Sequence, residues 1–517
     1  MSFTSFTYIA FLVLLTVVYY CIPKRMQWMI LLAASYVFYC SSGVRTVVYL
    51  LFTTVTVYAA GLLLGRLNAQ RKALSDADKA GLQQRIRHRK KAVVAAACVL
   101  NFGMLFLLKY WDYTAGLLDR ALGTALPRLD LLMPLGVSFF VFQSVGYVID
   151  VYRGKQEPQR NLAKLALFTS FFPQIIQGPI SRYHQLAPQL FARRSVDYEQ
   201  LRAGIQLILW GFFKKLLIAE RVGVVADTVY TSPSSYPGSI LALGTLAYCI
   251  QLYCDFSGGI DITRGTAQML GIEMTENFRR PLFAHSLADF WRRWHITLGS
   301  WMRDYVFYPL SLSRPFGRLG RWSRKHIKGK AGKILATSLA TFVVYLLIGI
   351  WHGSSLKYIF FGFYNGIIIT TSLLLEATFV SWRARLRMEE HSRAWSLFRI
   401  ARTCVIVFIG RYITRAPRLL TGLAMLWNTV TDFQPAALLS DTVLSLGIGW
   451  TDYLIVALAS AVLVAVEYAQ ERGVHIRQWL AARPPAVQFA AVLLPLLLLL
   501  FGTGGDYVPA QFIYAQF

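Results

Sequence analysis

Two histidines lie within apolar stretches, where an ionisable side chain is costly unless a site requires it. His352 follows the apolar run 334–351, and only the stretch His352-Gly-Ser-Ser-Leu-Lys357 separates it from the next run, 358–375. Histidine is the side chain best suited to accept a proton near neutral pH, and apolar surroundings favour its neutral, basic form. The position predicts a general base, with Trp351 and Gly353 beside it allowing close approach of a long, thin substrate. The alternative is a histidine that only forms a hydrogen bond between helices.

His295 lies in the densest polar cluster of the chain, residues 289–304. The cluster begins and ends with an acid and also contains arginines and tryptophans, namely Asp289, Trp291, Arg292, Arg293, Trp294, Trp301 and Asp304. At helical spacing Asp289 pairs with Arg292 or Arg293, and Trp291 shares a face with His295. An aromatic belt with snorkelling arginines at the membrane surface is the alternative. A histidine between two acids favours a functional site.

Two further polar sets interrupt apolar sequence. Gln143, Tyr147 and Asp150 are spaced i, i+4 and i+7, which places them on one face of a helix. The segment 251–259 carries Asp255 and Ser257. Both sets are candidates for lining a substrate tunnel, and a hydrogen-bond network between helices is the alternative.

The apolar run within 165–190 is short and is broken by Pro173 and Pro179. Non-helical backbone at membrane depth is tolerated only where protein or a water-filled cavity surrounds it. We therefore predict a re-entrant segment that lines a cavity, with Gln177 and Arg182 as candidate lining residues. An interfacial helix is the alternative.

The elements that position these candidate residues are predicted to be helices that span a membrane. Of the 517 residues, 56% are hydrophobic and 15% charged, whereas soluble domains carry about 25% charged residues. Residues 1–22 and 486–505 contain no charge, and about 20 such residues cross a bilayer as a helix. The sequence predicts an all-α polytopic protein with about eleven to thirteen spans, including one at 92–118 and a last one at 486–502.

The formal net charge of +27 is concentrated between the apolar runs, at 66–91, 314–333, 381–399 and 471–485. Loops rich in lysine and arginine stay in the cytoplasm and attract anionic lipids, so no nucleic-acid partner is needed to explain the charge. The arrangement predicts a multi-pass membrane protein, with the N-terminus and the C-terminal tail external.

We predict a single membrane domain, 1–517, with N-terminal helices (1–120), a core (130–375), C-terminal helices (376–502) and an external tail (503–517). The motifs G-x-x-x-x-G-K-[ST], H-E-x-x-H and G-x-S-x-G are absent, which leaves ATP hydrolysis, zincin and serine-hydrolase chemistry without support. The six cysteines are scattered, so we expect neither a metal site nor a disulfide framework.

Five segments in the same order resemble the membrane-bound O-acyltransferase family, most closely its bacterial alginate O-acetyltransferases and D-alanyl lipoteichoic acid transferases. The segments are MPLGVSFFVFQSVGYVIDVYRG, SFFPQIIQGPISRY, YCDFSGGIDI, ADFWRRWHITLGSWMRDYVFYPL and LIGIWHGSSLKYIFFGFYNG. The resemblance covers roughly residues 1–375 and the extreme C-terminus. It implies that His352, in Trp-His-Gly, is catalytic and that His295, in Arg-Trp-His, is a second functional histidine. It also implies a bacterial plasma (inner) membrane and a ring of helices around a funnel or tunnel.

The last six residues, 512–517, resemble the Phe-x-Tyr-x-x-Phe tail associated with acyl-export systems, although Ala515 stands where a phenylalanine is often found. In lipoteichoic acid D-alanylation a similar tail belongs to a separate small protein. The resemblance makes Tyr514 the expected acyl acceptor; a disordered apolar end is the alternative.

The resemblance implies an enzyme that moves an acyl group, most simply acetyl, from a cytoplasmic thioester to a cell-surface polysaccharide, with the two histidines as its catalytic groups. No cofactor is bound permanently; acetyl-CoA or an acyl-carrier-protein thioester is the expected donor. An extracellular or periplasmic polysaccharide acetyltransferase resembling SGNH hydrolases is the expected recipient. The alternatives are D-alanyl transfer to teichoic acid, a transporter of polysaccharide or lipid-linked sugar, and a scaffold for a polymer synthase.

Overall fold

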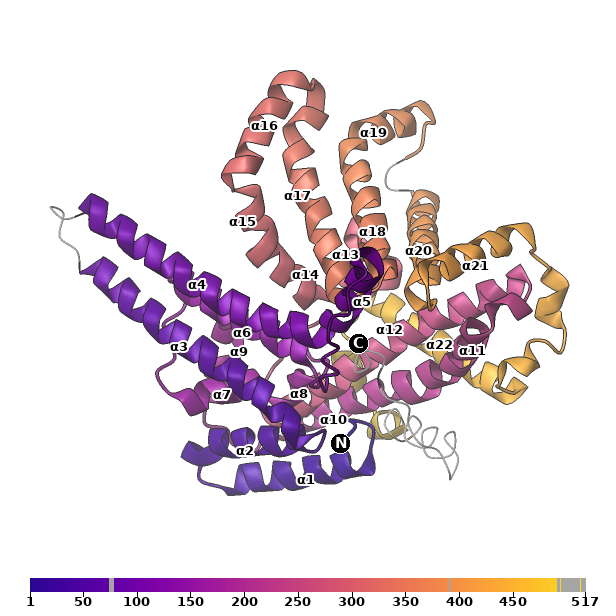
Figure 1. Cartoon of the computed structure of the whole chain (residues 1–517). Coiled ribbons are helices and arrows are strands. Elements are labelled where there is room, and N and C mark those ends of the chain that lie inside the picture. The colour runs from indigo at the N-terminus through magenta and orange to yellow at the C-terminus, as the bar shows by residue number, and fades with distance from the viewer. Residues whose placement is uncertain (74–78, 390–391, 491–492, 494–511, 513–517) are drawn as a thin grey trace. The chain divides into compact units, whose positions relative to one another are not determined.

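The computed structural model describes the chain except residues 74–78, 390–391, 491–492, 494–511 and 513–517 (Figure 1). The described residues form helices and no strand, with one isolated bridge between Phe278 and Trp294. The predicted all-α fold is confirmed. The chain forms two compact units, the first comprising Met1–Ile208 and Gly259–Thr275 and the second Leu209–Gly258 and the described chain from Glu276 to Phe512. Each unit is described by itself.

The first unit contains nine helices of the described chain and the beginning and end of two others. They are α1 (Phe6–Cys21), α2 (Gln27–Cys40), α3 (Val47–Lys72), α4 (Lys79–Lys109), α5 (Trp111–Leu122), α6 (Val137–Arg153), α7 (Leu162–Ser170), α8 (Phe172–Ile175) and α9 (Tyr183–Leu190), with parts of α10 (Tyr198–Phe212) and α12 (Gly238–Met269). Helices α3 and α4 lie side by side (Figure 1), and α6 packs on both. A Cβ at Gly61 would lie 2.9 Å from the Tyr147 hydroxyl, so glycine permits this close packing of α3 and α6.

The segment predicted to be re-entrant is broken and buried in the first unit. It forms α7, α8 and α9, with Pro173 in the first turn of α8 and Pro179 between α8 and α9. The break leaves the Phe168 carbonyl without a helical donor, and the side-chain amides of Gln143 and Gln174 donate to it at 2.7 and 3.1 Å. The break is therefore confirmed. Gln143 forms a hydrogen bond between helices, and its role in lining a tunnel stays a prediction.

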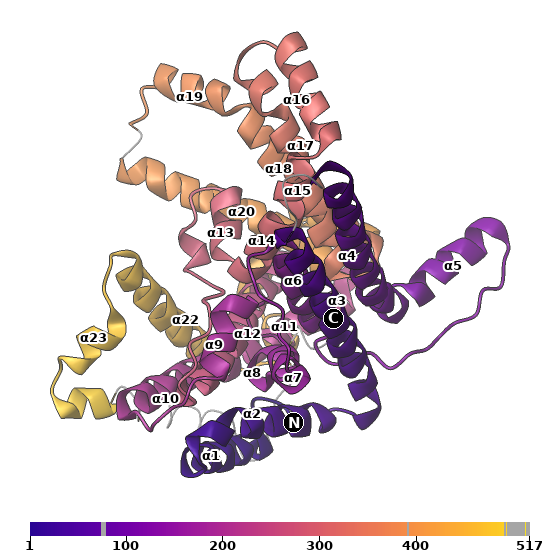
Figure 2. The same cartoon turned by 90° about the vertical axis from the view of Figure 1, so that its left-hand side faces the viewer.

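Two features differ most from expectation: the basic stretches and the span predicted at 92–118. The basic residues of 66–91 and 314–333 lie largely on helices, because lysine and arginine are good helix formers. The span predicted at 92–118 is interrupted at Tyr110, and α5 leaves the axis of α4 (Figure 2). The loop after α5 holds this bend: the Trp111 indole donates to the Pro127 carbonyl at 3.0 Å.

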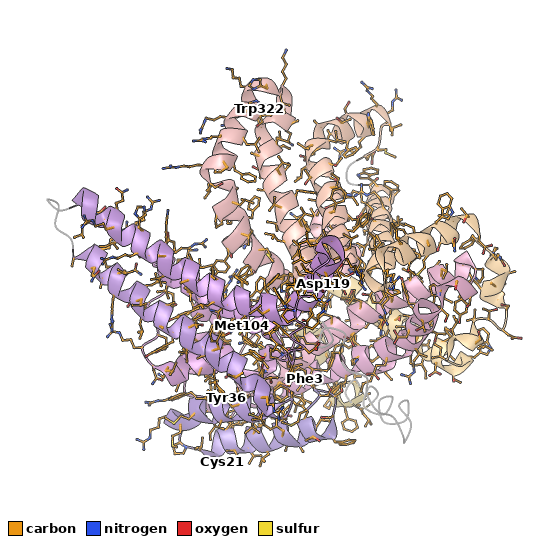
Figure 3. All side chains as sticks on the ribbon, viewed as in Figure 1. Phe3, Cys21, Tyr36, Met104, Asp119 and Trp322 are labelled. Carbon is orange, nitrogen blue, oxygen red and sulfur yellow. The ribbon has the colours of Figure 1, made fainter. Side chains whose placement is uncertain are left out.

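Asp119, labelled on α5 in Figure 3, accepts hydrogen bonds from the Leu126 amide at 2.9 Å and the Thr124 hydroxyl at 3.1 Å. Arg128 pairs with the same carboxylate at 2.9 Å. The amide of Leu126, followed by Thr124 and Arg128, holds the pKa of Asp119 below its usual value.

The second unit contains the remaining helices. They are the end of α10, a π-helix (Phe213–Ala219), α11 (Glu220–Thr231), most of α12, α13 (Leu287–Arg293), α14 (Ile296–Met302), a second π-helix (Arg303–Phe307), α15 (Tyr308–Ser311), α16 (Arg314–His326), α17 (Gly329–His352), α18 (Leu356–Leu374), α19 (Glu376–Arg385), α20 (Arg393–Arg415), α21 (Leu419–Thr431), α22 (Trp450–Glu471) and α23 (Ile476–Ala481). Short 3-10 turns connect several of them in both units, at 24–26, 44–46, 233–235, 281–283, 435–439 and 444–446.

Five helical stretches of the described residues are long and apolar enough to cross a membrane: Val44–Lys72, Gly81–Lys109, Gly238–Met269, Gly329–His352 and Trp450–Glu471. Helices α18 and α19 form a sixth candidate, bent by 62°. A multi-pass membrane protein is therefore confirmed. The larger number of spans stays a prediction, because much of the apolar sequence forms shorter helices and the span at 486–502 lies largely outside the described residues.

The hairpin of α17 and α18 places His352 at the end of α17, as the two apolar runs predict. The two helices touch at Gly349 and Gly362: a Cβ on Gly349 would collide with the Tyr358 carbonyl and lie 2.9 Å from the Gly362 Cα. On the other side α16 packs along α17 (Figure 2), where the Ser323 hydroxyl donates to the Gly332 carbonyl at 2.7 Å. Backbone contact across small residues thus fixes the helix that carries the histidine.

Replacing Gly349 by alanine is expected to force α17 and α18 apart and to displace His352. Overpacking of this kind costs about 1–3 kcal/mol, measurable as a lower unfolding temperature in detergent together with reduced acyl transfer. Gly103→Ala is the matched control, because nothing lies within 4 Å of a Cβ added on that face of α4. Equal behaviour of the two variants would contradict the role of the hairpin contact.

Candidate functional site

His352 is half-buried in an aromatic environment of the second unit. Its ring centroid lies 4.8 Å from that of Trp351, 5.9 Å from that of Phe361 and 6.4 Å from that of Tyr358. Gly353 follows, and a Cβ at this position would collide with the Tyr358 ring at 2.5–2.6 Å. The glycine lets the chain turn into α18 while Tyr358 stays against the histidine.

His295 occupies the residue between α13 and α14 and is only 2% exposed. Its backbone is left-handed, with φ at +49°, a conformation that is uncommon outside glycine and is found at functional sites when the surroundings enforce it. Here the Ile296 amide donates to the Asn277 carbonyl at 3.0 Å, and the Arg279 amide donates to the Arg293 carbonyl at 2.9 Å. Pairing with the segment 277–279 therefore replaces helical hydrogen bonds at this point.

This break corrects one prediction. Trp291 and His295 do not share a helical face, because α13 ends at Arg293. The Trp291 indole instead donates to the Asn365 side-chain oxygen on α18, at 3.0 Å. Trp294 is buried, with its ring 5.0 Å from that of Phe278.

The side chain of Asn277 determines the protonation pattern of His295. Its Oδ1 accepts the Thr297 amide at 3.0 Å and the Thr297 hydroxyl at 2.9 Å, and lies 3.2 Å from Nδ1 of His295. Because an amide N–H is always a donor, Oδ1 must be the acceptor, and Nδ1 of His295 must carry the proton. In the neutral ring the basic lone pair is then on Nε2.

Trp351 brings the two histidines together. Its ring centroid lies 5.8 Å from that of His295 and 4.8 Å from that of His352. The two residues that the sequence singled out, 57 positions apart, thus flank a single indole. This juxtaposition is the central geometric feature of the candidate site.

The charged ends of the 289–304 cluster form ion pairs. Asp289 pairs with Arg292 at 3.5 Å and with Arg293 at 3.2 Å, which confirms the predicted helical pairing. Arg293 also pairs with Glu471 on α22 at 3.0 Å, and Asp304 pairs with Arg303 at 3.0 Å. Arg293 therefore links α13 to α22. That Asp289, Arg292 and Asp304 line a substrate tunnel stays a prediction.

Asp255 and Ser257 belong to a buried network whose other members were missed from the sequence. Lys215 donates to Asp255 at 2.6 Å and pairs with Glu220 at 3.2 Å, while Lys214 donates to the Ser257 hydroxyl at 3.0 Å. The two lysines lie on the π-helix, a conformation frequent at functional sites. The run 213–220, with Lys-Lys and Glu within apolar sequence, was the available signal.

Arg411 on α20 is the other buried charge that sequence reasoning missed. It is 6% exposed, and its guanidinium lies 5.4 Å from the Trp294 ring centre and 5.7 Å from that of Phe361. Because Phe361 also contacts His352, the C-terminal helices contribute to the site, although the recognisable motifs ended near residue 375. An arginine inside the apolar run 404–413 was the signal.

The other predicted site residues do not belong to the described part of the second unit. Gln143, Gln177 and Arg182 belong to the first unit, and Tyr514 lies outside the described residues. Gln177 is fully buried, and its side-chain amide has no hydrogen-bond partner among the described residues. Such a group calls for a bound water or ligand, which is consistent with a substrate-facing position.

Comparison with known proteins identifies the family. The profile of the membrane-bound O-acyltransferase family matches residues 159–414, which include both histidines and the buried lysines. A probable alginate O-acetylase of Pseudomonas syringae pv. tomato is 31% identical over 405 residues, covering 78% of this chain and 69% of that protein. The chain belongs to the membrane-bound O-acyltransferase family.

Relatives of lower identity are named for other polymers. The peptidoglycan O-acetyltransferase of Helicobacter pylori is 28% identical over 307 residues, covering 54% of this chain and 55% of that protein. The teichoic acid D-alanyltransferase of Bacillus subtilis is 27% identical over 336 residues, covering 63% of this chain and 80% of that protein. The predicted enzyme class, an O-acyltransferase within the membrane, is confirmed.

Asn277→Ala is expected to lower the rate of acyl transfer about 5- to 150-fold, because it releases the His295 ring and leaves the Thr297 amide without its acceptor, a loss of about 1–3 kcal/mol. The rate is measured with purified protein and labelled thioester. Asn101→Ala removes an equally buried asparagine from α4 of the first unit and serves as the control. A normal rate for Asn277→Ala would show that the His295 orientation is irrelevant to turnover.

Proposed function

We propose that this membrane-bound O-acyltransferase transfers an acetyl group from a cytoplasmic thioester to Tyr514, for export to a cell-surface polysaccharide. The observation that carries the proposal is the placement of His352 and His295 against one indole, Trp351, with the tautomer of His295 fixed by Asn277. Two imidazoles in a buried aromatic site supply a proton acceptor and a second group that orients or stabilises charge.

In the proposed step, His352 takes the proton from the Tyr514 hydroxyl as the phenolic oxygen attacks the thioester carbonyl. The oxygen–carbon bond forms, the carbon–sulfur bond breaks, and the departing thiolate takes the proton back from the imidazolium. A phenol with an ordinary pKa near 10 needs such a base. It also leaves readily in a second transfer.

His295 is assigned to orienting the donor or the acceptor, or to stabilising charge on the carbonyl oxygen. General-base assistance contributes roughly 10²- to 10⁴-fold, and removal of a group that stabilises the oxyanion costs about 10²- to 10³-fold. Loss of either imidazole is therefore expected to lower turnover at least about 100-fold.

The proposed donor is acetyl-CoA or an acyl carrier protein thioester, with no permanently bound cofactor. Acetyl is favoured over D-alanyl because the relatives at 31–33% identity are probable alginate O-acetylases, whereas the D-alanyltransferases share 26–27%. The exposed arginines and lysines of α16, around Trp322 in Figure 3, give this helix a charge suited to phosphate-bearing donors.

We place the protein in a bacterial inner membrane, with its basic segments in the cytoplasm and both termini outside. The acyl-tyrosine then faces the exterior and passes its group to an extracellular or periplasmic acetyltransferase resembling SGNH hydrolases. This topology separates the thioester from the polymer and makes the tail the carrier between them.

Incubation of the purified protein with labelled acetyl thioester is expected to leave the label on Tyr514, as mapped by mass spectrometry, and His352→Ala is expected to lower labelling at least about 100-fold. Tyr514→Phe is expected to abolish it. Label on another residue, or turnover that persists in Tyr514→Phe, would remove the relay and leave the acyltransferase.

In cells, His352→Ala is expected to remove acyl esters from the polymer while polymer export continues. Reduced export of an otherwise normally acylated polymer would instead favour a transporter. Esters are measured on isolated polymer by release in mild base, and protein level in the membrane is the control.

A further inference from the structure

The ring of Phe512 is buried in the second unit, with 3% of the residue exposed. Its centroid lies 4.7 Å from the ammonium nitrogen of Lys215. An ammonium at this distance from an aromatic ring is attracted by the electron-rich face, and the attraction increases when both groups are removed from water. The first residue of the C-terminal motif is therefore seated on a specific cation.

The ammonium of Lys215 is held by two carboxylates. Asp255 lies 2.6 Å away and Glu220 3.2 Å away, and the side chains of Lys215 and Asp255 are each 2% exposed. These ion pairs leave the lysine little freedom to rotate, so its charge is directed at a fixed point. We call Lys215, Asp255 and Glu220 the lysine cluster.

The lysine cluster is connected to the histidine pair through α12. Phe256 follows Asp255 in the sequence, and its ring lies 5.0 Å from that of His295. His295 in turn contacts Trp351, which contacts His352. A continuous series of contacting or adjacent side chains therefore links the binding position of Phe512 to both imidazoles.

We propose that the lysine cluster is the docking site for the aromatic residue that begins the tail and that it sets the register in which Tyr514 reaches His352. This inference rests on the proposed acylation of Tyr514. Tyr514 follows Phe512 by two residues, and two residues span at most about 7 Å. Fixing Phe512 therefore limits the positions that the Tyr514 side chain can reach. The cluster selects an aromatic ring, because an aliphatic side chain fills the volume but offers no electron-rich face to the ammonium.

The buried charge of Lys215 also couples binding of the tail to the stability of the lysine cluster. A charge inside an apolar site is stabilised by partners on each side, and two carboxylates occupy only part of the surroundings of Lys215. The ring of Phe512 covers another part when the tail is docked. Binding of the tail and stabilisation of the lysine cluster are therefore coupled.

Fluorination of Phe512 tests the docking contact in the full-length protein. Phenylalanines with one, two and three ring fluorines are introduced at position 512, which weakens the face of the ring with little change in shape. The rate of labelling at Tyr514 is expected to fall stepwise, about tenfold over the series. The same series at Phe489, which is 66% exposed, is the matched control and is expected to leave the rate unchanged. A flat series at position 512 would overturn the cation–ring contact.

Crosslinking tests the location without relying on acyl transfer. A benzoyl-phenylalanine at position 512 is expected to crosslink, on illumination, to peptides from the π-helix Phe213–Ala219 or from α12 near Asp255. Crosslinks elsewhere would overturn the docking site even if Tyr514 is acylated. Crosslinks at the expected peptides without acylation of Tyr514 would retain the docking site and remove the relay.

Substitution of the lysine itself completes the test. In Lys215→Met the dependence on fluorination is expected to disappear, because the rings no longer face a charge. Lys90→Met is the control, since Lys90 is also buried and lies 5.0 Å from the Tyr152 ring. If Lys215→Met does not fold, Lys215→Arg, which retains the charge, is expected to preserve the stepwise decline. A decline that persists unchanged in folded Lys215→Met would contradict the proposal.

Discussion

The constraint behind the whole structure is that a polar group inside a membrane protein must find its partner within the protein. The break between α7 and α8 leaves a backbone carbonyl that two glutamines satisfy. The break between α13 and α14 is stabilised in the same way, by backbone pairing with the segment 277–279 and by the side chain of Asn277. In both places the helix is interrupted, and buried side-chain amides form the hydrogen bonds that the backbone loses.

This requirement links fold to chemistry at His295. The oxygen of Asn277 that accepts the backbone amide of Thr297 also accepts a hydrogen bond from Nδ1 of the histidine ring. A single side chain therefore stabilises the break and selects the tautomer. His352 is placed differently, at the end of a helix held by glycine contacts with α18. One histidine is fixed by hydrogen bonds and the other by packing, and Trp351 is the surface on which they meet.

Local patterns in the sequence predicted the features that depend on local physics. Apolar runs gave the hairpin around His352, and helical spacing gave the ion pairs of Asp289. The same spacing failed for Trp291 and His295, because the hydrogen bonds that end α13 come from residues more than ten positions earlier. Lys215 and Arg411 were missed for the same reason: what makes each of them part of the site is contact with residues far along the chain, Asp255 in one case and Trp294 and Phe361 in the other.

Lys215 and Arg411 also represent two different ways of accommodating a buried cation. Lys215 is held by two carboxylates and also faces the ring of Phe512. Arg411 lies against two aromatic rings, and no carboxylate of the described residues forms an ion pair with it. Ring faces stabilise a cation without cancelling its charge, so the field of Arg411 extends into surroundings of low dielectric, where Coulomb interactions are strong. Arg411 and His352 both contact Phe361, so in the proposed transfer we expect Arg411 to stabilise negative charge that develops on the acyl oxygen.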